Sequence, residues 1–258
     1  MDWSHYFFYF QKIGTRYFLA AGIAFFVFYF LLKNKVSHRK IQQKYPLPKD
    51  YLREAGYSVT TIFIFAVVPL VILQVPEITA HTFFYKDIST YGWFYFFMAF
   101  PLMFVIHDTY FYWTHRLMHN KKLFKIFHLV HHQSTNPSPW AAYAFHPLEA
   151  IVEAGIFVVF LFVLPMHRLH LLIFFFLMII YNVYGHLGFE LYPKHFNKHW
   201  LGRWINTSTN HNQHHQFFKG NYSLYFLWWD RWMKTIRDDY DEHYERVMSA
   251  RKTKIEME

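Results

Sequence analysis

The sequence predicts an all-α integral membrane protein whose helices bring a set of histidines together at one end. Three observations lead to this fold class. Hydrophobic residues make up 54% of the 258 positions, and 32 Phe and 20 Tyr make the chain too apolar for an ordinary soluble domain. Long apolar runs recur along the chain, and many of its 19 histidines fall into tight groups. We expect about four to five membrane spans.

The apolar runs give the expected spans in order. Full spans are expected at residues 17–32, 57–75 and 91–106. Pro69 would kink the second of them. Two further runs follow at residues 151–164 and 169–184. They are short for the roughly 20 residues that a full crossing needs, so they could also form a tilted or shallow hairpin.

The two ends of the chain have a different composition. Residues 1–16 are aromatic but contain Lys12 and Arg16, which is typical of a helix that lies at the membrane interface. From Asp238 onward the tail is charged, and we expect a solvated helix there.

Charge and composition exclude several classes of protein. The net charge is +9, but the basic residues flank apolar segments instead of forming one patch, so no nucleic-acid partner is expected. The chain has no cysteine, which excludes disulfides, thiolate ligands and iron–sulfur clusters. No linker or repeat is visible, so we expect one domain, 1–258. Its parts would be the N-terminal helices and spans (1–90), the histidine-rich region (91–237) and the charged tail (238–258).

The loops predict the orientation in the membrane. Residues 33–53 hold seven Lys or Arg residues and one Asp, whereas residues 76–90 hold one Lys and two acids. Cytoplasmic loops carry the excess of Lys and Arg, so residues 33–53 should be cytoplasmic. Counting spans from there places all three groups of histidines on the cytoplasmic side.

Eight histidines form three motifs whose spacing suits one face of a helix. The motifs are H-R-L-M-H, H-L-V-H-H and H-N-Q-H-H, with His115, His119, His128, His131, His132, His211, His214 and His215. Residues three or four apart share a helix face, so each motif can direct its rings into one site. By chance H-x-x-H-H is expected roughly 0.1 times in such a chain, so two copies are a specific signal.

Eight imidazoles are too many for one metal ion. Two ions with four or more nitrogens each would use them all, whereas one four-coordinate zinc ion would leave half of them idle. Imidazole binds zinc, copper, iron and nickel, so the ligand type by itself leaves the metal open.

An acid and a further histidine lie shortly before the first motif. Asp108 precedes His115 by seven residues and His119 by eleven, and both offsets fall within about 20° of one helix face. We therefore expect Asp108 to accept a hydrogen bond from a ligand imidazole and orient it. His107 is turned away by roughly 80° and is a weaker candidate ligand.

Other histidines are candidate ligands by position. His186 follows the last apolar run, where a helix would leave the membrane near the motifs. His146 precedes a proline, and His195 and His199 lie in a polar loop. Each of these three is a weaker candidate for the metal site.

Five segments together carry a family resemblance. They are H-D-T-Y-F-Y-W-T-H-R-L-M-H, H-L-V-H-H, A-F-H-P, G-H-L-G-F-E and the run N-T-S-T-N-H-N-Q-H-H through W-W-D-R-W, and they span about residues 95–237. In this order they resemble the fatty acid hydroxylase/sterol desaturase superfamily. The three-residue gap between His115 and His119 is similar to the sterol desaturase branch.

The resemblance implies a fold, a cofactor and an activity. It implies a transmembrane helical stem under a cytosolic helical cap that encloses a histidine-rich dimetal site. The eight motif histidines would hold two iron ions, and His186 matches a further histidine of the family pattern. O2 would be the co-substrate for hydroxylation or desaturation of a lipid C–H bond. The sequence does not decide between these two reactions, nor between a sterol, a fatty acyl chain and another lipid.

Electrons would come from a separate donor protein, of the ferredoxin or cytochrome b5 type, since the chain shows no fused haem domain. Zinc could replace iron during purification. Two other functions stay open at this point: a membrane metal-binding or transport protein without oxidative activity, and a hydrolase with a zinc pair. Transport would favour ionisable residues inside the spans, and the first three spans hold almost none.

Overall fold

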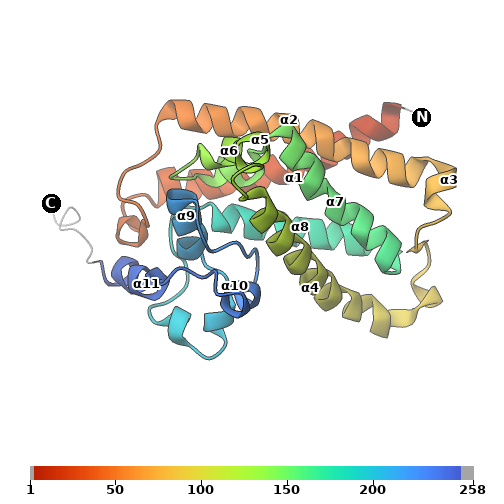
Figure 1. The fold of residues 1–258 in the computed structure, drawn as a ribbon. Coiled ribbons are helices and arrows are strands. Elements are labelled where there is room, and N and C mark those ends of the chain that lie inside the picture. Colours follow the sequence, from red (N-terminus) through yellow and green to blue (C-terminus); the bar gives the residue numbers. More distant parts are fainter. Residues whose placement is uncertain (1–2, 251–258) are drawn as a thin grey trace.

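Long apolar helices run side by side through most of the described chain, residues 3–250 of the computed structural model (Figure 1). The long helices are α1 (Trp3–Phe25), continued by a π-helical segment η1 (Phe26–Leu31), α2 (Pro48–Gln74), α4 (Gly92–Met118), α7 (Pro147–Val163) and α8 (Arg168–Gly185). Four of these stretches are long and apolar enough to cross a membrane: Trp3–Leu31, Pro48–Gln74, Gly92–Met118 and Arg168–Gly185. The predicted all-α fold class is confirmed.

Local sequence explains where these helices begin. Pro48 and Pro147 occupy the first helical position of α2 and α7, where a missing N–H costs nothing. The Asp50 carboxylate accepts a hydrogen bond from the Leu47 amide at 3.0 Å, and His146 Nδ1 accepts one from the Leu148 amide at 3.3 Å. Both contacts satisfy amides at the helix ends.

Shorter elements gather at one end of the long helices and form the cap (Figure 1). Its helices are α5 (Phe124–Phe127), α6 (Leu129–His132), α9 (Ser208–Phe217), α10 (Trp228–Trp232) and α11 (Tyr240–Ser249). The other 3-10 turns are η2 (Ser37–Arg39), η4 (Pro139–Tyr143), η5 (Phe196–Lys198) and η6 (Gly202–Trp204), whereas η3 (Ile88–Thr90) precedes α4 at the opposite end of the long helices. At the opposite end, α3 (Pro76–Thr79) is followed by a two-stranded parallel pairing of β1 (Phe84–Tyr85) with β2 (Met166–His167).

The expected interfacial helix at residues 1–16 is wrong for the described part, because α1 is continuous from Trp3 through this segment and on into η1. Gly14 packs toward Ile62 of α2, so the helix is held against the bundle. Lys12 and Arg16 lie within this helix and line a cavity between the long helices, with Lys12 exposed and Arg16 partly buried. Residues 1–2 lie outside the described part.

The charged tail is a helix, as predicted, but it is not simply solvated. α11 buries Tyr240, Tyr244 and Val247 on one face, next to Leu227 of the cap. The Tyr244 hydroxyl donates to the Pro193 carbonyl at 2.9 Å. Residues 251–258 of the predicted tail lie outside the described part.

Candidate metal centre

The three histidine motifs come from separate elements that meet in the cap. The first motif ends α4, the second forms α6 with the residue before it, and the third lies on α9. His186 caps the carboxyl end of α8. α9 is polar but buried over most of its length. Glu190 satisfies its first turn, since the Glu190 carboxylate accepts hydrogen bonds from the Thr209 amide at 3.0 Å and the Thr209 hydroxyl at 2.7 Å.

The histidines sort into two groups, in each of which the potential ligand atoms lie within 4.8 Å of one another. We call them group one and group two. Group one contains His115, His119, His128, His132 and His214. Group two contains His131, His186, His211 and His215. The structure thus brings together all eight motif histidines and His186.

The Nε2 atoms within each group face one another. In group one, His115 Nε2 lies 2.9 Å from His128 Nε2, and His132 Nε2 lies 3.0 Å from His214 Nε2. In group two, the four Nε2 atoms lie 3.1–3.3 Å from their neighbours. These separations match neighbouring ligands around one cation with metal–nitrogen bonds of about 2.1 Å.

The opposite ring nitrogens show which tautomers are present. Nδ1 of His115 faces the Tyr222 carbonyl at 2.8 Å, and Nδ1 of His214 faces the Gly220 carbonyl at 2.7 Å. In group two, Nδ1 of His186 and of His215 face the carbonyls of Asn182 and Ser134 at 2.8 and 3.0 Å. A carbonyl only accepts, so each of these Nδ1 atoms carries the proton and Nε2 presents a lone pair.

Neutral imidazoles with converging lone pairs repel one another unless a cation lies between them. The buried site keeps the rings neutral, since burial lowers the pKa of His119 to about 2 and that of His186 to about 4. Burial also moves the pKa of His211, His214 and His215 well below its ordinary value. Both groups therefore fit metal ions, each of which would bind unprotonated nitrogens.

Glu149 is a site residue that the sequence analysis did not identify. Its carboxylate Oε1 lies 2.7 Å from His128 Nδ1, and both side chains are buried. Glu149 lies in the first turn of α7, where an acid also interacts favourably with the helix dipole. An acid that begins a strongly apolar helix beside histidine motifs was the available signal.

The expected role of Asp108 is wrong. Its carboxylate accepts hydrogen bonds from the backbone amides of Tyr225 and Phe226, at 2.7 and 3.2 Å, and from no imidazole among the described residues. Helix geometry correctly placed Asp108 on the same face of α4 as His115. It could not reveal the loop between α9 and α10, whose amides bind the Asp108 carboxylate. Asp108 fixes this loop, and the loop supplies the Tyr222 carbonyl that orients His115.

The four weaker candidate ligands lie outside both groups. His107 Nδ1 lies 3.0 Å from the Tyr225 hydroxyl. His146 caps α7, and His199 Nδ1 accepts from the Leu201 amide at 3.3 Å. His195 is on the surface, with Nδ1 2.9 Å from Oε2 of Glu245. Each of these rings already has a partner away from the converging Nε2 atoms.

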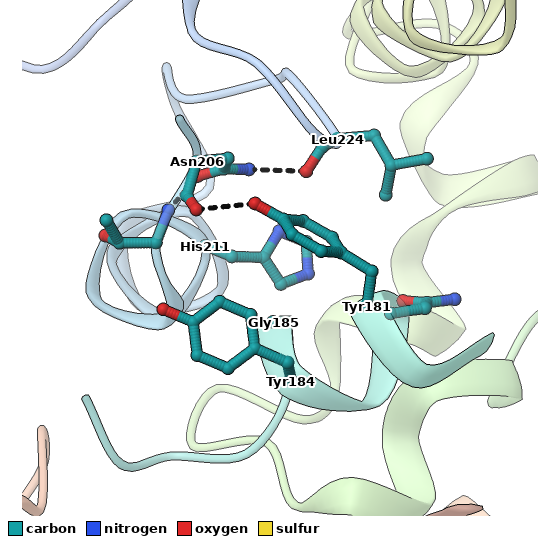
Figure 2. Close-up of a pocket in the computed structure, with 8 residues that line it drawn as sticks. Tyr181, Tyr184, Gly185, Asn206, His211 and Leu224 are labelled. Carbon is teal, nitrogen blue, oxygen red and sulfur yellow. Dashed lines mark hydrogen bonds between the residues drawn. The ribbon is translucent and has the colours of Figure 1, made fainter. Parts of the chain in front are cut away.

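A small pocket of about 10 Å³ lies beside group two, where only a molecule the size of water fits. Figure 2 shows the His211 ring between Tyr181 and Tyr184, close to Gly185. The Tyr181 hydroxyl donates to the Asn206 carbonyl at 2.6 Å, and Asn206 Nδ2 donates to the Leu224 carbonyl at 3.0 Å (Figure 2).

A far larger cavity, of about 770 Å³, runs between the long helices and has the size of a lipid-binding site. Its walls are mostly apolar and come from α1, α2, α4, α7 and α8. Two of its lining residues touch the histidines: the Phe111 ring lies 4.9 Å from the His115 ring, and the Phe145 ring lies 5.1 Å from the His131 ring. The cavity therefore leads to both groups.

Comparison with known proteins agrees with this architecture. The family model described as fatty acid hydroxylase matches residues 100–235, more than half of the chain. A Delta(7)-sterol 5(6)-desaturase of Gibberella zeae is 31% identical over 226 residues, which cover 86% of this chain and 64% of that protein. The lathosterol oxidase of Rattus norvegicus is 28% identical over 217 residues, covering 83% of this chain and 68% of the oxidase.

A third relative is the C-4 methylsterol oxidase of Schizosaccharomyces pombe, 36% identical over 155 residues, which cover 58% of this chain and 49% of that enzyme. The chain thus spans about half to two thirds of the length of these relatives. No solved structure matches it. From the matched family model and these relatives, the chain belongs to the fatty acid hydroxylase family, in its sterol desaturase branch.

Proposed function

We propose that this protein is a membrane-bound oxidoreductase that uses O2 and two iron ions to hydroxylate or desaturate a lipid C–H bond. The observation that carries the proposal is the convergence of nine imidazoles into two groups at the end of a lipid-sized cavity. The relatives named as desaturases and oxidases support an oxidative reaction.

The donor set supports iron as the metal. Imidazole suits both iron and zinc, but a reaction that removes hydrogen from an unactivated carbon needs a redox-active ion, and zinc has no redox chemistry. When bound, the iron pair would supply the activation of O2. Group one and group two would each hold one ion, with Nε2 as the ligand atom.

The chain's own residues would position both the ligands and the substrate. Backbone carbonyls and Glu149 hold the outer ring nitrogens, which keeps Nε2 aimed inward. Phe111 and Phe145 separate the apolar cavity from the histidines, so they would place a substrate carbon beside the site and limit the entry of water.

The proposal includes the surroundings of the protein. The substrate would be a membrane lipid that enters from the bilayer, and the histidine end would face the cytoplasm. An acidic donor protein of the ferredoxin or cytochrome b5 type would supply electrons, guided by exposed cations near the histidines such as Lys121, Lys122 and Lys125. The whole chain would act as one catalytic domain.

Comparative lipid mass spectrometry of cells with and without the gene tests this function. The expected result is a lipid that gains one oxygen atom or loses two hydrogen atoms only when the gene is present. Metal analysis of anaerobically purified protein should find two iron ions per chain. Zinc at the site together with lipid hydrolysis, or metal flux into vesicles without any oxidised lipid, would contradict the proposal.

A further inference from the structure

The lining of the large cavity is unevenly charged. Four cationic side chains line it, from Lys12, Arg16, Lys86 and Arg168, against the single carboxylate of Glu153. Glu153 lies one helical turn after Glu149, which contacts His128, so the carboxylate is at the histidine end of the cavity. The cavity therefore carries excess positive charge.

Two of the cations are brought together by strand pairing. β1 and β2 pair in parallel, with Phe84 opposite Met166 and Tyr85 opposite His167. Lys86 and Arg168 directly follow the last paired residues of the two strands, so they begin at the same end of this pairing. The His167 ring also contacts the Lys86 carbonyl, with Nε2 3.1 Å from the oxygen. Both side chains are exposed at this end of the cavity, where they can meet a charged group at its mouth.

The Asp87 carboxylate is adjacent to Lys86 in the chain, but no ion pair joins it to either cation. Neither Lys86 nor Arg168 forms an ion pair with any side chain in residues 3–250. The adjacent Asp87 carboxylate accepts from the Ser89 amide at 3.0 Å and does not line the cavity.

The two cations and the histidines lie at opposite ends of the cavity. The face of α8 that lines the cavity runs from Arg168 through Phe175 to Asn182, which is about 21 Å at the rise of an α-helix. The Asn182 carbonyl contacts His186 of group two, so this face connects the cations to the metal centre.

We propose that the cavity binds a lipid with an anionic head group, held by Lys86 and Arg168, with its tail extended along α8 toward the histidines. Given the proposed oxidation, the reacting carbon then lies in the body or tail of the lipid, far from the head group. Lys12 and Arg16 also line the cavity and add to the attraction for an anion.

A binding experiment with matched probes tests the head group. Full-length protein in non-ionic detergent should bind oleate at least about tenfold more tightly than oleyl alcohol, which has the same chain, because charge-assisted hydrogen bonds of this kind reach that magnitude. The double variant Lys86→Gln/Arg168→Gln should lose this preference without weaker binding of the alcohol. The swap Lys86→Arg/Arg168→Lys should keep it, and so should the matched control Lys122→Gln, which changes an exposed cation away from the cavity. Equal binding of oleate and alcohol by the wild type would overturn the proposal.

Photo-crosslinking tests the orientation and distinguishes a substrate from a lipid of the surrounding bilayer. A fatty acid with its photoreactive group at the methyl end should label the segments around Phe145 and Asn182. One with the group beside the carboxylate should label residues 84–86 and 166–168. Reversed labelling, or labelling confined to the lipid-facing surface at Trp93 and Phe94, would overturn the proposal.

The two proposals fail separately. Labelling in the expected order without O2-dependent turnover of any lipid would count against the proposed oxidation and leave the binding mode intact. Turnover together with reversed labelling would refute the binding mode alone.

Discussion

The two histidine groups differ in number of rings, partners and surroundings. Group one has five rings, and one of them, His128, contacts a buried carboxylate. Group two has four rings, and the outer nitrogens of His186 and His215 face neutral carbonyls. Only group two adjoins the small pocket shown in Figure 2, which shares Asn182 and Leu224 with the large cavity.

This difference indicates a division of labour. A carboxylate that accepts a hydrogen bond from the outer nitrogen of an imidazole makes that imidazole a stronger metal ligand. We therefore expect group one to hold its ion more tightly. Four rings leave more of an ion's coordination free than five, and the pocket and cavity give small molecules a route to that side. We therefore expect group two to be the side at which external molecules react.

The largest effect is expected from removing one ring of each group. His131→Ala removes one of the four rings of group two, and His119→Ala removes one of the five rings of group one. Each should lower turnover by at least about 100-fold, since even changes behind the ligands commonly cost 10- to 100-fold. Metal analysis should show a larger loss of ion for His131→Ala. His195→Ala, outside both groups, is the control, and full activity of His131→Ala would refute the assigned ligand set.

The pH dependence of the metal-free protein comes next in size. Burial lowers the folded-state pKa of His186 to about 4 and of His119 to about 2, against an ordinary value near 6.5. Below pH 6.5 the unfolded chain binds more protons than the folded one, so the free energy of unfolding falls as the pH falls. Each such histidine contributes at most about 1.4 kcal/mol per pH unit. Burial raises the pKa of acids such as Glu190, which has the opposite effect on stability. The histidine contribution is therefore measured as the difference in melting temperature between metal-free wild type and metal-free His186→Gln at pH 7, 6 and 5. A difference that does not change with pH would contradict a neutral, buried ring.

A smaller effect is expected from changing the partner of His128. Glu149→Gln keeps the size of the side chain but replaces the carboxyl group with an amide, which cannot carry the negative charge that would offset a bound cation through the 2.7 Å contact with His128. We expect group one to bind its ion roughly 10- to 100-fold more weakly while group two is little changed. Metal titration of the variant against the wild type measures both. Weakening of both groups by the same factor would remove the distinction between them.

The smallest effect is expected at the pocket beside group two. A Cβ added at Gly185 would lie 3.4 Å from His211 Cδ2, which is close but tolerable contact, and would narrow the pocket. If O2 is the co-substrate, as proposed, Gly185→Ala should raise its KM a few-fold without loss of metal. Gly56→Ala, where a Cβ meets nothing within 4 Å, is the matched control. An unchanged KM for O2 would show that small molecules reach the site by another route.

The sequence predicted the elements better than the contacts between them. Histidine spacing identified the rings that converge, because residues three and four apart share a helix face in any fold. It could not reveal Tyr222, Gly220 or Asn182 as partners, because they act through backbone carbonyls that leave no trace in residue type. The same limit explains the error at Asp108, whose partners lie more than a hundred residues away in the chain.

The interfacial helix at residues 1–16 failed for a related reason. Lys12 and Arg16 give this segment the composition of a helix at a membrane surface. Only the packing of the long helices shows that both side chains line a cavity between them. The two charged residues were therefore correctly identified as unusual in an apolar segment, but their surroundings were predicted wrongly.

Neighbouring histidines serve different groups at two places in the cap. His131 belongs to group two and His132 to group one, on the single turn of α6, and His215 and His214 repeat the arrangement on α9. An ion bound in either group therefore orders both of these turns. The entropic cost of ordering the rings is then lower when the second ion binds. The second ion should accordingly bind somewhat more tightly than the first, by a factor smaller than the loss expected for group one in Glu149→Gln.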